Sequence, residues 1–574
     1  MAKPVSSLLC AAASIGALMY SSSALSQIAA PSQVTPPSLR PQFPAGEQPL
    51  RLPGPLETAV PPGNAAMAVV VGEAQLDGAF PELRTLTDPL IARVKGQRVS
   101  VAQIYALATN LEGLYSRAGY PLVRVSVPPQ QLVDGGTLRL VVIDGFIEAI
   151  DVNTLPERVR NVVAGRTNLL LGRPHLTTEQ IERALLIAGD VPGLRLRSTL
   201  VRGTREGGVR LVLEGEHRLI SGSAGADDRL SRSLGTWQLR GTLALNSALG
   251  AGEQIYGTAG LSTDLRAASA GDAPFSLYGG GAVVPIGADG ITVNPEYTHS
   301  RTVTKQTPGA PASLGSFDRF ALRLRGPIGL SRKASLYANL AVEDVEQQIS
   351  APDFGVALSH DHYRVLRGGI DYATTLPSQA GLQLGAQLSK GLGGRNAEDA
   401  ITSRVPLSRI GATPDFVKLA ATARLSQPLP AGFRFDVIGT SQITGGKAML
   451  RSEQLSLDGS DALSAFASGT LNADEGFTLR GELAYPFVFN AFGTGAAASP
   501  YLFAAGGRGW IASPSAVEQA ALNAGAVGTG VRSSVSIPGS SADASLAVEI
   551  ARGFTDVSGV RQGWRANVLG TVSF

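Results

Sequence analysis

Residues 477–485 read Phe-Thr-Leu-Arg-Gly-Glu-Leu-Ala-Tyr, and apolar and polar side chains alternate along them. In an extended strand, successive side chains point to opposite faces. One face of this stretch therefore carries apolar groups: Phe477, Leu479, Leu483 and Tyr485. The other face carries polar groups: Thr478, Arg480 and Glu482. The stretch predicts a β-strand with one apolar face and one charged face.

The same alternation recurs through residues 217–574. Residues 317–325 and 545–551 repeat it, and short turns alternate with longer Gly-, Ser- and Pro-rich loops between such segments. A soluble β-sandwich would show the same period. A transmembrane barrel is favoured because the arginines need a hydrated lumen, and because a closed barrel leaves no unpaired strand edge in lipid. We predict a transmembrane β-barrel of about 16 antiparallel strands, wide enough for an aqueous channel.

The composition fits a large β-protein and excludes two other classes. Charged residues make up 17% of the 574 residues, and there are 68 glycines. Beyond the N-terminal region, no run of about 18 uncharged apolar residues occurs, which excludes membrane-spanning helices. The 49 basic and 46 acidic residues nearly balance, so the chain lacks the polycationic footprint of a nucleic-acid binder.

The two ends of the chain carry export signals. Residues 1–26 have the pattern of a secretory signal peptide, and they contain the only cysteine, Cys10. Residues 27–66 form a proline-rich linker, in which no helix is predicted because each proline lacks an N–H and fixes φ. The last predicted strand runs from Trp564 to Phe574, and its terminal aromatic residue resembles the assembly signal of outer-membrane barrels.

Two mixed α/β modules are predicted before the barrel, over residues 67–149 and 150–216. Each contains a helix whose start is marked by a capping box: Ser100 with Gln103, and Thr177 with Gln180. Strands are predicted at five places: residues 67–76, 122–127, 138–143, 194–200 and 209–214. Neither module contains a cluster of polar groups that suggests catalysis.

The order of residues in these modules resembles the paired polypeptide-transport-associated (POTRA) domains of two-partner secretion transporters, the haemolysin secretion/activation family. In the second module the matching residues are Gly172-Arg173-Pro174, Thr177, Ile181-Glu182-Arg183-Ala184-Leu185-Leu186 and Asp190-Val191-Pro192-Gly193. In the first module they are Tyr115, Gly119-Tyr120, Pro129, Gln131, Gly136, Leu138 and Gly145-Phe146-Ile147-Glu148.

The resemblance implies a type V secretion pore in the outer membrane of a Gram-negative bacterium, with its POTRA domains in the periplasm. The expected partners are a secreted exoprotein of the large β-helical adhesin or haemolysin type, outer-membrane lipid, and the outer-membrane assembly machinery during biogenesis. The modules would capture the unfolded exoprotein by strand addition or in a helix–strand groove. Candidate contact residues are Tyr115, Tyr120, Leu122, Arg124, Leu194 and Leu196.

In this family a long loop enters the barrel and ends in a V-R-G-[FY] motif, whose arginine pairs with an aspartate of the barrel wall in an F-x-D-x-G-like setting. Residues 445–475 occupy the place of that loop, but the tip reads Leu463-Ser464-Ala465-Phe466. The expected wall acid is replaced by Ala504. Both charges are therefore predicted to be lost, the loop to be weakly held, and the family's N-terminal plug helix to have no counterpart.

No motif predicts chemistry. His360 and His362 flank Asp361 and suggest solvated side chains rather than a metal site. Neither a nucleophile elbow nor a complete phosphate-binding loop occurs. We expect no catalytic residues, no metal, no cofactor and no nucleic-acid partner. The alternatives to secretion are an outer-membrane protein assembly factor of the same superfamily and a passive diffusion porin.

Overall fold

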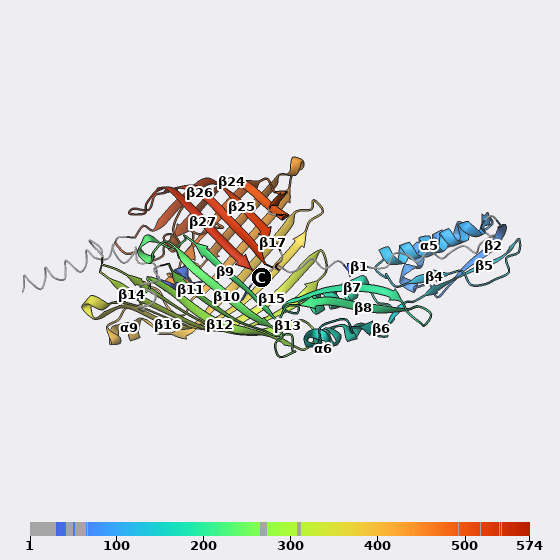
Figure 1. Cartoon of the computed structure of the whole chain (residues 1–574), viewed down its shortest axis with the longest axis horizontal. Helices are drawn as coiled ribbons and strands as arrows, with labels where there is room; N and C mark the ends of the chain where they lie inside the picture. Colours follow the sequence, from blue (N-terminus) through green and yellow to red (C-terminus); the bar gives the residue numbers. More distant parts are fainter. Residues whose placement is uncertain are drawn as a thin grey trace, which may run out of the picture.

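The chain forms a β-barrel from one mouth of which two small α/β modules extend, as the computed structural model in Figure 1 shows. The structure describes residues 30–41, 50–51, 65, 67–263, 272–306, 311–491, 493–516, 518–538, 540 and 542–574. The predicted signal peptide, residues 1–26, lies outside these ranges, as does much of the predicted linker. Within the described residues, no helix combines the length and the apolar character needed to cross a membrane.

The first module is a four-stranded sheet in the order β3-β2-β5-β4, covered by two helices. Its elements are β2 (Ala68–Asp77), α4 (Arg84–Ala92), β3 (Arg98–Ser100), α5 (Val101–Arg117), β4 (Arg124–Ser126) and β5 (Gly136–Ile143). The predicted capping box starts α5, because the Ser100 hydroxyl accepts the Gln103 N–H while the Gln103 side chain accepts the Ser100 N–H. The apolar stripe of α5 packs on β2 and β5 and fixes the module.

The second module repeats this plan with the sheet order β1-β7-β8-β6. Its elements are β1 (Leu50–Arg51), β6 (Phe146–Asp151), α6 (Glu157–Thr167), α7 (Thr178–Gly189), β7 (Leu194–Arg202) and β8 (Gly208–His217). Because β6 pairs with β8, Phe146–Asp151 belongs to the second module, and the predicted boundary at residue 149 is too late. Leu122 of the first module is buried in the core of the second, so the two modules share a packed junction.

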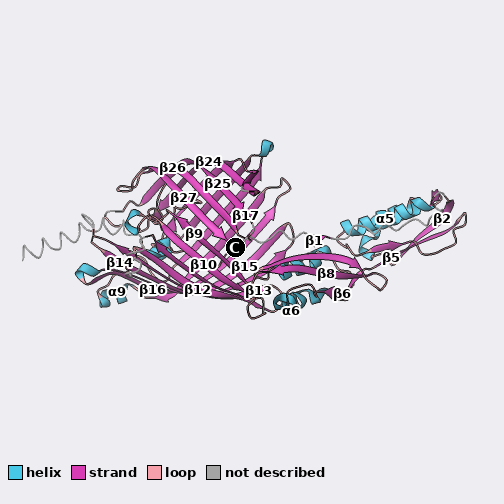
Figure 2. Ribbon diagram, viewed as in Figure 1, coloured by secondary structure: helices cyan, strands magenta, loops and turns pink. Residues whose placement is uncertain are grey.

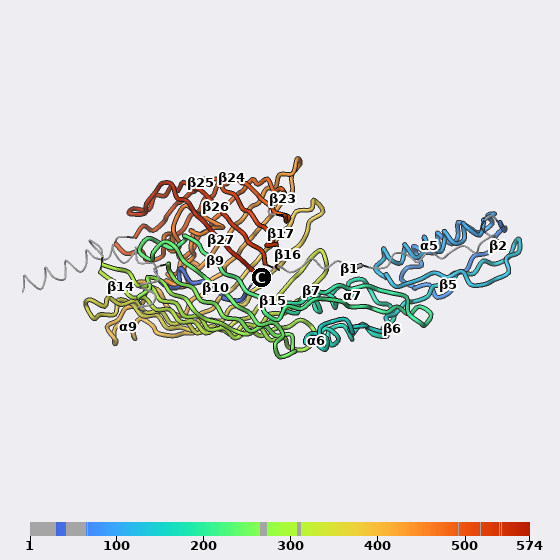
Figure 3. Tube along the Cα trace, viewed as in Figure 1, coloured from blue at the N-terminus to red at the C-terminus, as the bar shows by residue number. Residues whose placement is uncertain are grey.

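The second module is attached by hydrogen bonds to the end of the barrel that faces it. Arg158 Nη1 donates to the Ala248 carbonyl at 2.8 Å, and Arg183 Nη2 donates to the Pro327 carbonyl at 3.3 Å. Figure 3 shows the modules following one another away from the barrel mouth, with the first one farthest out. The second module therefore lies at the entrance to the lumen.

The barrel consists of antiparallel strands, each paired with its neighbour, and it closes where β27 pairs with β9 (Figure 2). Its strands are β9 (Ile220–Asp227), β10 (Gln238–Asn246), β11 (Gln254–Ser262), β12 (Phe275–Ile286), β13 (Ile291–Thr304), β14 (Ser313–Leu330), β15 (Ala334–Ala351), β16 (Val356–Thr375), β17 (Gly381–Gly394), β18 (Val417–Pro428), β19 (Arg434–Ile443), β22 (Glu475–Ala484), β23 (Phe487–Ala491), β24 (Thr494–Trp510), β25 (Ala521–Ser536), β26 (Asp543–Thr555) and β27 (Gly563–Ser573). A short helix, α9 (Ala397–Ser403), lies in the connection between β17 and β18.

Two of these labels belong to one crossing. Both β22 and β23 pair with β24, and only Tyr485 and Pro486 lie between them. The strand is interrupted there because proline has no N–H to donate to the ladder. The barrel thus has 16 crossings, which confirms the predicted fold class.

The predicted alternation separates the two faces of the barrel. On β14 the residues Phe320, Leu322 and Leu324 face outward and are 53%, 47% and 41% exposed. On β22 the outward Leu479 is 55% exposed, whereas Arg480 beside it is fully buried in the interior. An apolar exterior and a polar interior are the arrangement that a lipid bilayer requires of a barrel.

Candidate functional site

The connection between β19 and β22, residues 444–474, folds inside the barrel and is called here the lumen loop. It contains a short pairing of β20 (Leu455–Ser456) with β21 (Asn472–Ala473). Its apolar side chains pack against the inner wall formed by β24, β25 and β26: Leu457, Leu463, Phe466 and Leu471. The predicted loop therefore enters the lumen and carries a core of its own.

The tip of the lumen loop is bonded to the wall through Ser464. Its hydroxyl donates to Glu549 Oε1 and accepts from Arg480 Nη1 at 2.9 Å, and its backbone carbonyl accepts from Asn567 Nδ2 at 2.9 Å. Arg480, Glu549 and Asn567 lie on β22, β26 and β27, so three separate strands contact one loop residue.

Arg480 is the centre of a buried charge network on the wall. Its Nη2 donates to Glu549 Oε2 at 2.6 Å and its Nε donates to Glu482 Oε1 at 2.6 Å. Arg532 donates two hydrogen bonds to Glu482, at 2.7 and 2.9 Å. The two arginines and two glutamates balance, so each buried charge has partners of opposite sign. Tyr501 adds a hydrogen bond to Glu549 at 2.8 Å.

Aromatic rings and glycines shape this wall. The Arg480 guanidinium lies 3.6 Å from the centre of the Phe503 ring, and the Arg532 guanidinium lies 4.0 Å from that of Tyr501. A Cβ at Gly528 would come within 2.6 Å of the Phe503 ring, and a Cβ at Gly530 within 2.5 Å of the Tyr501 hydroxyl. Because these two residues of β25 are glycines, the rings of Phe503 and Tyr501 can lie directly against its backbone.

The base of the lumen loop is held by a second set of charges around Glu453. This carboxylate accepts from Arg367 Nη2 at 2.7 Å and from the Tyr363 hydroxyl at 2.6 Å, and the Lys418 ammonium lies 2.9 Å from it. Glu453 is 1% exposed. The loop is thus fastened at its base as well as at its tip.

The prediction that the loop is weakly held is wrong. The tip has no arginine, as the sequence showed, but Arg480 approaches the same point from the wall. The family motif pairs one loop residue with one wall residue, whereas Ser464 bonds to three wall residues on different strands. The missed residues were visible only as the inward polar positions of the predicted strands, among them Arg480 and Glu482.

The prediction that Ala504 faces the loop is also wrong. On β24 the side chains of Tyr501 and Phe503 are buried in the lumen, whereas Leu502 and Ala504 are exposed on the outer face. The inward small residue is Ala505, which is opposite Arg480 in the strand register. A shift of one residue along a strand changes the face of every side chain. An aspartate introduced at residue 504 would face lipid and leave the loop untouched.

A second segment inside the barrel corrects the predicted helix-free linker. Residues 30–41 contain one helical turn, α3 (Pro31–Val34), and the dark blue trace in Figure 3 places them among the barrel strands. Proline is compatible with the first turn of a helix, where its missing N–H would have no partner. The prediction that no plug element exists is therefore wrong, although the element is a single turn.

Polar wall residues hold this segment. Glu296 of β13 accepts hydrogen bonds from the Ser38 hydroxyl and the Leu39 N–H, both at 2.9 Å. Arg319 and Arg323 of β14 donate to the Pro36 and Pro37 carbonyls, both at 3.0 Å. The segment, here called the lumen segment, thus lies against the wall opposite the lumen loop's tip network.

Most of the predicted cargo-contact residues belong to the module cores. Four are buried: Tyr115, Leu122, Leu194 and Leu196. Their role is packing, and the prediction that they contact cargo is wrong for the folded modules. Tyr120 and Arg124 are half-buried, so they remain candidates.

Trp564 and Phe574 lie on the outer face, 67% and 45% exposed, and their role in assembly stays a prediction.

The edges of the two module sheets differ in their access. At the outer edge of β4, Glu112 of α5 accepts the Val125 N–H at 2.8 Å, and burial raises the pKa of the Glu112 carboxyl. At the outer edge of β7, residues 50–51 add a parallel strand, pairing Leu50 with Ser198. The edge of β4 is capped by a side chain, whereas the edge of β7 accepts extended backbone.

The described residues contain no group of three or more side chains that could hold a metal ion. His360 and His362 instead contact Glu346 and Asp344, at 3.0 and 3.1 Å.

Ser464→Ala should loosen the tip of the lumen loop. The change removes the hydroxyl that joins Arg480 to Glu549, two charged partners, at a cost of about 1.5–3 kcal/mol per lost bond. Single-channel current in planar bilayers should then fluctuate between more levels than in the wild type. Ser460→Ala is the matched control, because Ser460 lies in the same loop and its hydroxyl bonds to none of the described residues. Identical traces for both variants would show that the Ser464 hydroxyl does not hold the loop.

Comparison with known proteins places this geometry in a family. The family described as "Haemolysin secretion/activation protein ShlB/FhaC/HecB" matches residues 207–532, more than half of the chain. The "POTRA domain, ShlB-type" family matches residues 72–145. The Hemolysin transporter protein ShlB of Serratia marcescens is 26% identical over 422 residues, which cover 69% of this chain and 68% of that one.

Other relatives match over shorter stretches. The Heme/hemopexin transporter protein HuxB of Haemophilus influenzae is 22% identical over 30% of this chain, and the Outer membrane transporter CdiB of Escherichia coli is 26% identical over 35%. These alignments span 31% and 34% of the length of the two relatives. The solved structure of CdiB from Escherichia coli has a TM-score of 0.65 at 19% identity, covering 96% of this chain and 95% of that one. CdiB from Acinetobacter baumannii gives 0.58 at 15% identity, with 92% and 95% covered. The two structures share the fold of this chain.

Proposed function

Because the chain belongs to the haemolysin secretion/activation family, we propose that it captures an unfolded polypeptide in the periplasm and passes it through its outer-membrane barrel to the cell surface. The expected cargo is a large exported polypeptide of the β-helical adhesin or haemolysin type. Outer-membrane lipid surrounds the barrel, and the outer-membrane assembly machinery inserts it. No step in this process needs a catalytic residue or a cofactor from this chain.

The observation that carries the capture step is the pairing of β1 with β7. Residues 50–51 of the chain itself lie as an added strand along the edge of the second module. Backbone hydrogen bonds of this kind bind extended polypeptide with little demand on its sequence. An unfolded cargo meets that requirement, and the edge lies on the module that contacts the barrel mouth.

The occupied lumen favours gated secretion over passive diffusion. The lumen loop and the lumen segment both fill part of the interior, and each is bonded to the wall. A diffusion porin needs a path that is permanently open. Membership in the secretion family likewise favours secretion over barrel assembly.

Ser198→Pro should reduce export several-fold by blocking the β7 edge. The Gly203 N–H donates to the Gly208 carbonyl, so the odd-numbered residues of β7 are the ones whose backbone groups bond to β8. In an antiparallel ladder the alternate residues point the other way, and the Ser198 N–H therefore points toward the edge along which β1 lies. Proline removes the N–H there, and it is tolerated on an edge strand. Export is measured as surface-exposed cargo in cells that carry the variant as their only copy.

Ser198→Ala is the matched control, since it removes the side-chain hydroxyl but keeps the backbone N–H. It should export at the wild-type level. The amount of protease-resistant barrel in the outer membrane should be equal in all three strains. Normal export by the proline variant would contradict strand addition at β7, and export by cells without the chain would contradict the proposed function itself.

A further inference from the structure

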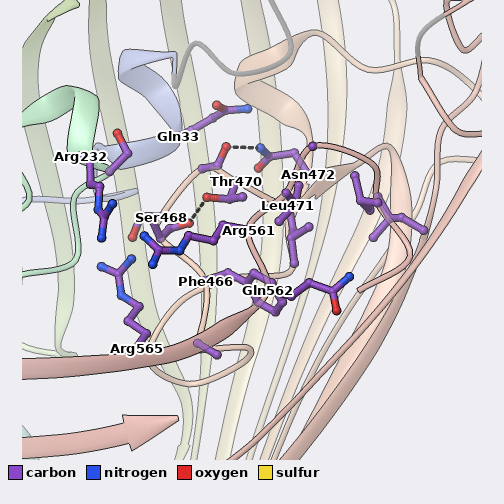
Figure 4. A pocket seen from close by; sticks show the side chains of 18 of the residues that line it. Gln33, Arg232, Phe466, Ser468, Thr470, Leu471, Asn472, Arg561, Gln562 and Arg565 are labelled. Carbon is purple, nitrogen blue, oxygen red and sulfur yellow. Dashed lines mark hydrogen bonds between the residues drawn. The ribbon is translucent and has the colours of Figure 1, made fainter. Parts of the chain in front are cut away.

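A cavity of about 670 Å³ lies inside the barrel at the mouth opposite the modules. Three connections between strands surround it, those following β9, β24 and β26, and residues 465–472 of the lumen loop form its floor. Gln33 of α3 also reaches it. Figure 4 shows the side chains that line the cavity, most of them polar.

Arginine dominates the charge of this cavity. Five arginines line it, Arg232, Arg409, Arg451, Arg561 and Arg565, against two acids, Asp228 and Glu518. Figure 4 shows the guanidinium ends of Arg232, Arg561 and Arg565 directed toward one another on one side of the cavity. Three cations brought together in this way repel one another unless an anion lies between them.

Asp228 attracts Arg565, but neither acid of the cavity pairs with Arg232 or Arg561. Glu518 accepts from Arg409 at 3.3 Å and from the Ser515 N–H at 2.9 Å. Asp228 accepts the Val568 N–H at 2.9 Å, and its backbone carbonyl accepts from Arg565 at 2.6 Å. In the described part of the chain, no carboxylate lies within ion-pair distance of Arg232 or Arg561. Both side chains are exposed to the cavity and available to a ligand.

The cavity faces the lumen and not the lipid. Trp564 is 67% exposed on the outer face of β27, so Arg565, the next residue, points inward. Neutral hydrogen-bonding groups complete the lining, among them Ser468, Thr470 and Gln562. A ligand therefore reaches these groups from water in the lumen or at its mouth, and not from the bilayer.

We propose that this cavity is an anion-binding site at the exit of the lumen, where Arg232, Arg561 and Arg565 bind carboxylate side chains of the emerging polypeptide. Guanidinium groups form strong, paired hydrogen bonds with carboxylates. The identity of the anion rests on the proposed secretion function, whereas the presence of an anion site does not. Successive acidic residues would bind here in turn as the chain leaves the barrel.

The test uses the purified full chain in planar bilayers with short synthetic peptides. Oligo-glutamate added on the side opposite the modules should reduce the single-channel current, and oligo-glutamine of the same length should not. In Arg232→Gln/Arg561→Gln the half-blocking concentration of oligo-glutamate should rise about a hundredfold, since each of the two lost charged hydrogen bonds weakens binding about tenfold or more. Arg565 is left in place because it also bonds to Asp228 and Asn567.

Arg93→Gln/Arg98→Gln is the matched control. It removes the same two charges from exposed positions of the first module, far from the cavity, and should leave the block unchanged. Equal block by both peptides, or no difference between the two double variants, overturns the anion site. Block by inorganic phosphate but not by oligo-glutamate overturns the polypeptide as its ligand and assigns the site to phosphate groups. Export of cargo by the wild type is measured separately. If that assay shows no secretion, the peptide block still decides whether the cavity binds anions.

Discussion

Deleting the first module, residues 67–143, should strongly reduce export and leave a folded barrel in the outer membrane. The module has its own apolar core, and the barrel closes without any of its strands. The second module keeps its hydrogen bonds to the end of the barrel that faces it. The deletion removes Tyr120 and Arg124, the two candidate contact residues that are half-buried, and leaves cargo only the β7 edge. Surface-exposed cargo is the measurement, together with the heat-modifiable barrel band in electrophoresis.

The shared junction between the modules calls for a second variant. The deletion also removes Leu122, which fills part of the core of the second module. Leu111→Asp unfolds the first module from within, because Leu111 is fully buried there, and it leaves Leu122 in the chain. Both variants should reduce export alike. Normal export by either, with a normal amount of barrel, would show that the first module plays no part in capture.

Arg480→Met should have the largest effect on barrel stability, about 3–5 kcal/mol. Methionine has a similar length but no charge, so Glu549 would stay buried without its strongest partner. The lumen loop would lose a hydrogen bond at Ser464 in the same step. The measurement is the temperature at which the folded band disappears in semi-native electrophoresis, and we expect it to fall markedly.

A second substitution separates charge from packing. In Arg480→Met/Glu549→Gln, the glutamine still bonds to Tyr501 and Ser464 but carries no charge, so the double variant should recover at least half of the lost stability. Arg552→Met is the control, because Arg552 is exposed on the barrel exterior. A double variant as unstable as the single one would mean that Arg480 acts through packing on Phe503 rather than through its charge.

The sequence predicts the elements of this protein well because each element obeys a local rule. The period of two in residues 477–485 predicted β22 and its faces, and the side-chain caps at Ser100 and Thr177 predicted the starts of α5 and α7. These rules involve residues a few positions apart. They determine which face of a strand is polar and where a helix begins.

The contacts of the site follow no local rule. Ser464 meets Arg480, Glu549 and Asn567, which are 16, 85 and 103 residues away in the sequence. Only the closure of the barrel brings them together. The error at Ala504 has a different cause. A shift of one residue in the assumed register of β24 moves each side chain from the face toward the lumen to the face toward the lipid. The helical turn at Pro31 was missed because proline excludes a helix only from its interior.

The way the lumen segment is held determines what its departure would leave behind. Its Ser38 hydroxyl and Leu39 N–H donate hydrogen bonds to the wall, and its Pro36 and Pro37 carbonyls accept them. Its apolar packing involves Ala30, Pro31, Val34 and Leu39. Water can replace each of those hydrogen bonds at small net cost. Departure of the segment would therefore let water reach Glu296, Arg319 and Arg323, and it would also uncover the apolar wall residues against which Leu39 packs, Phe275 and Leu277 among them. Release of the segment would exchange its hydrogen bonds with three charged wall side chains for hydrogen bonds with water, and ionic strength should shift that exchange.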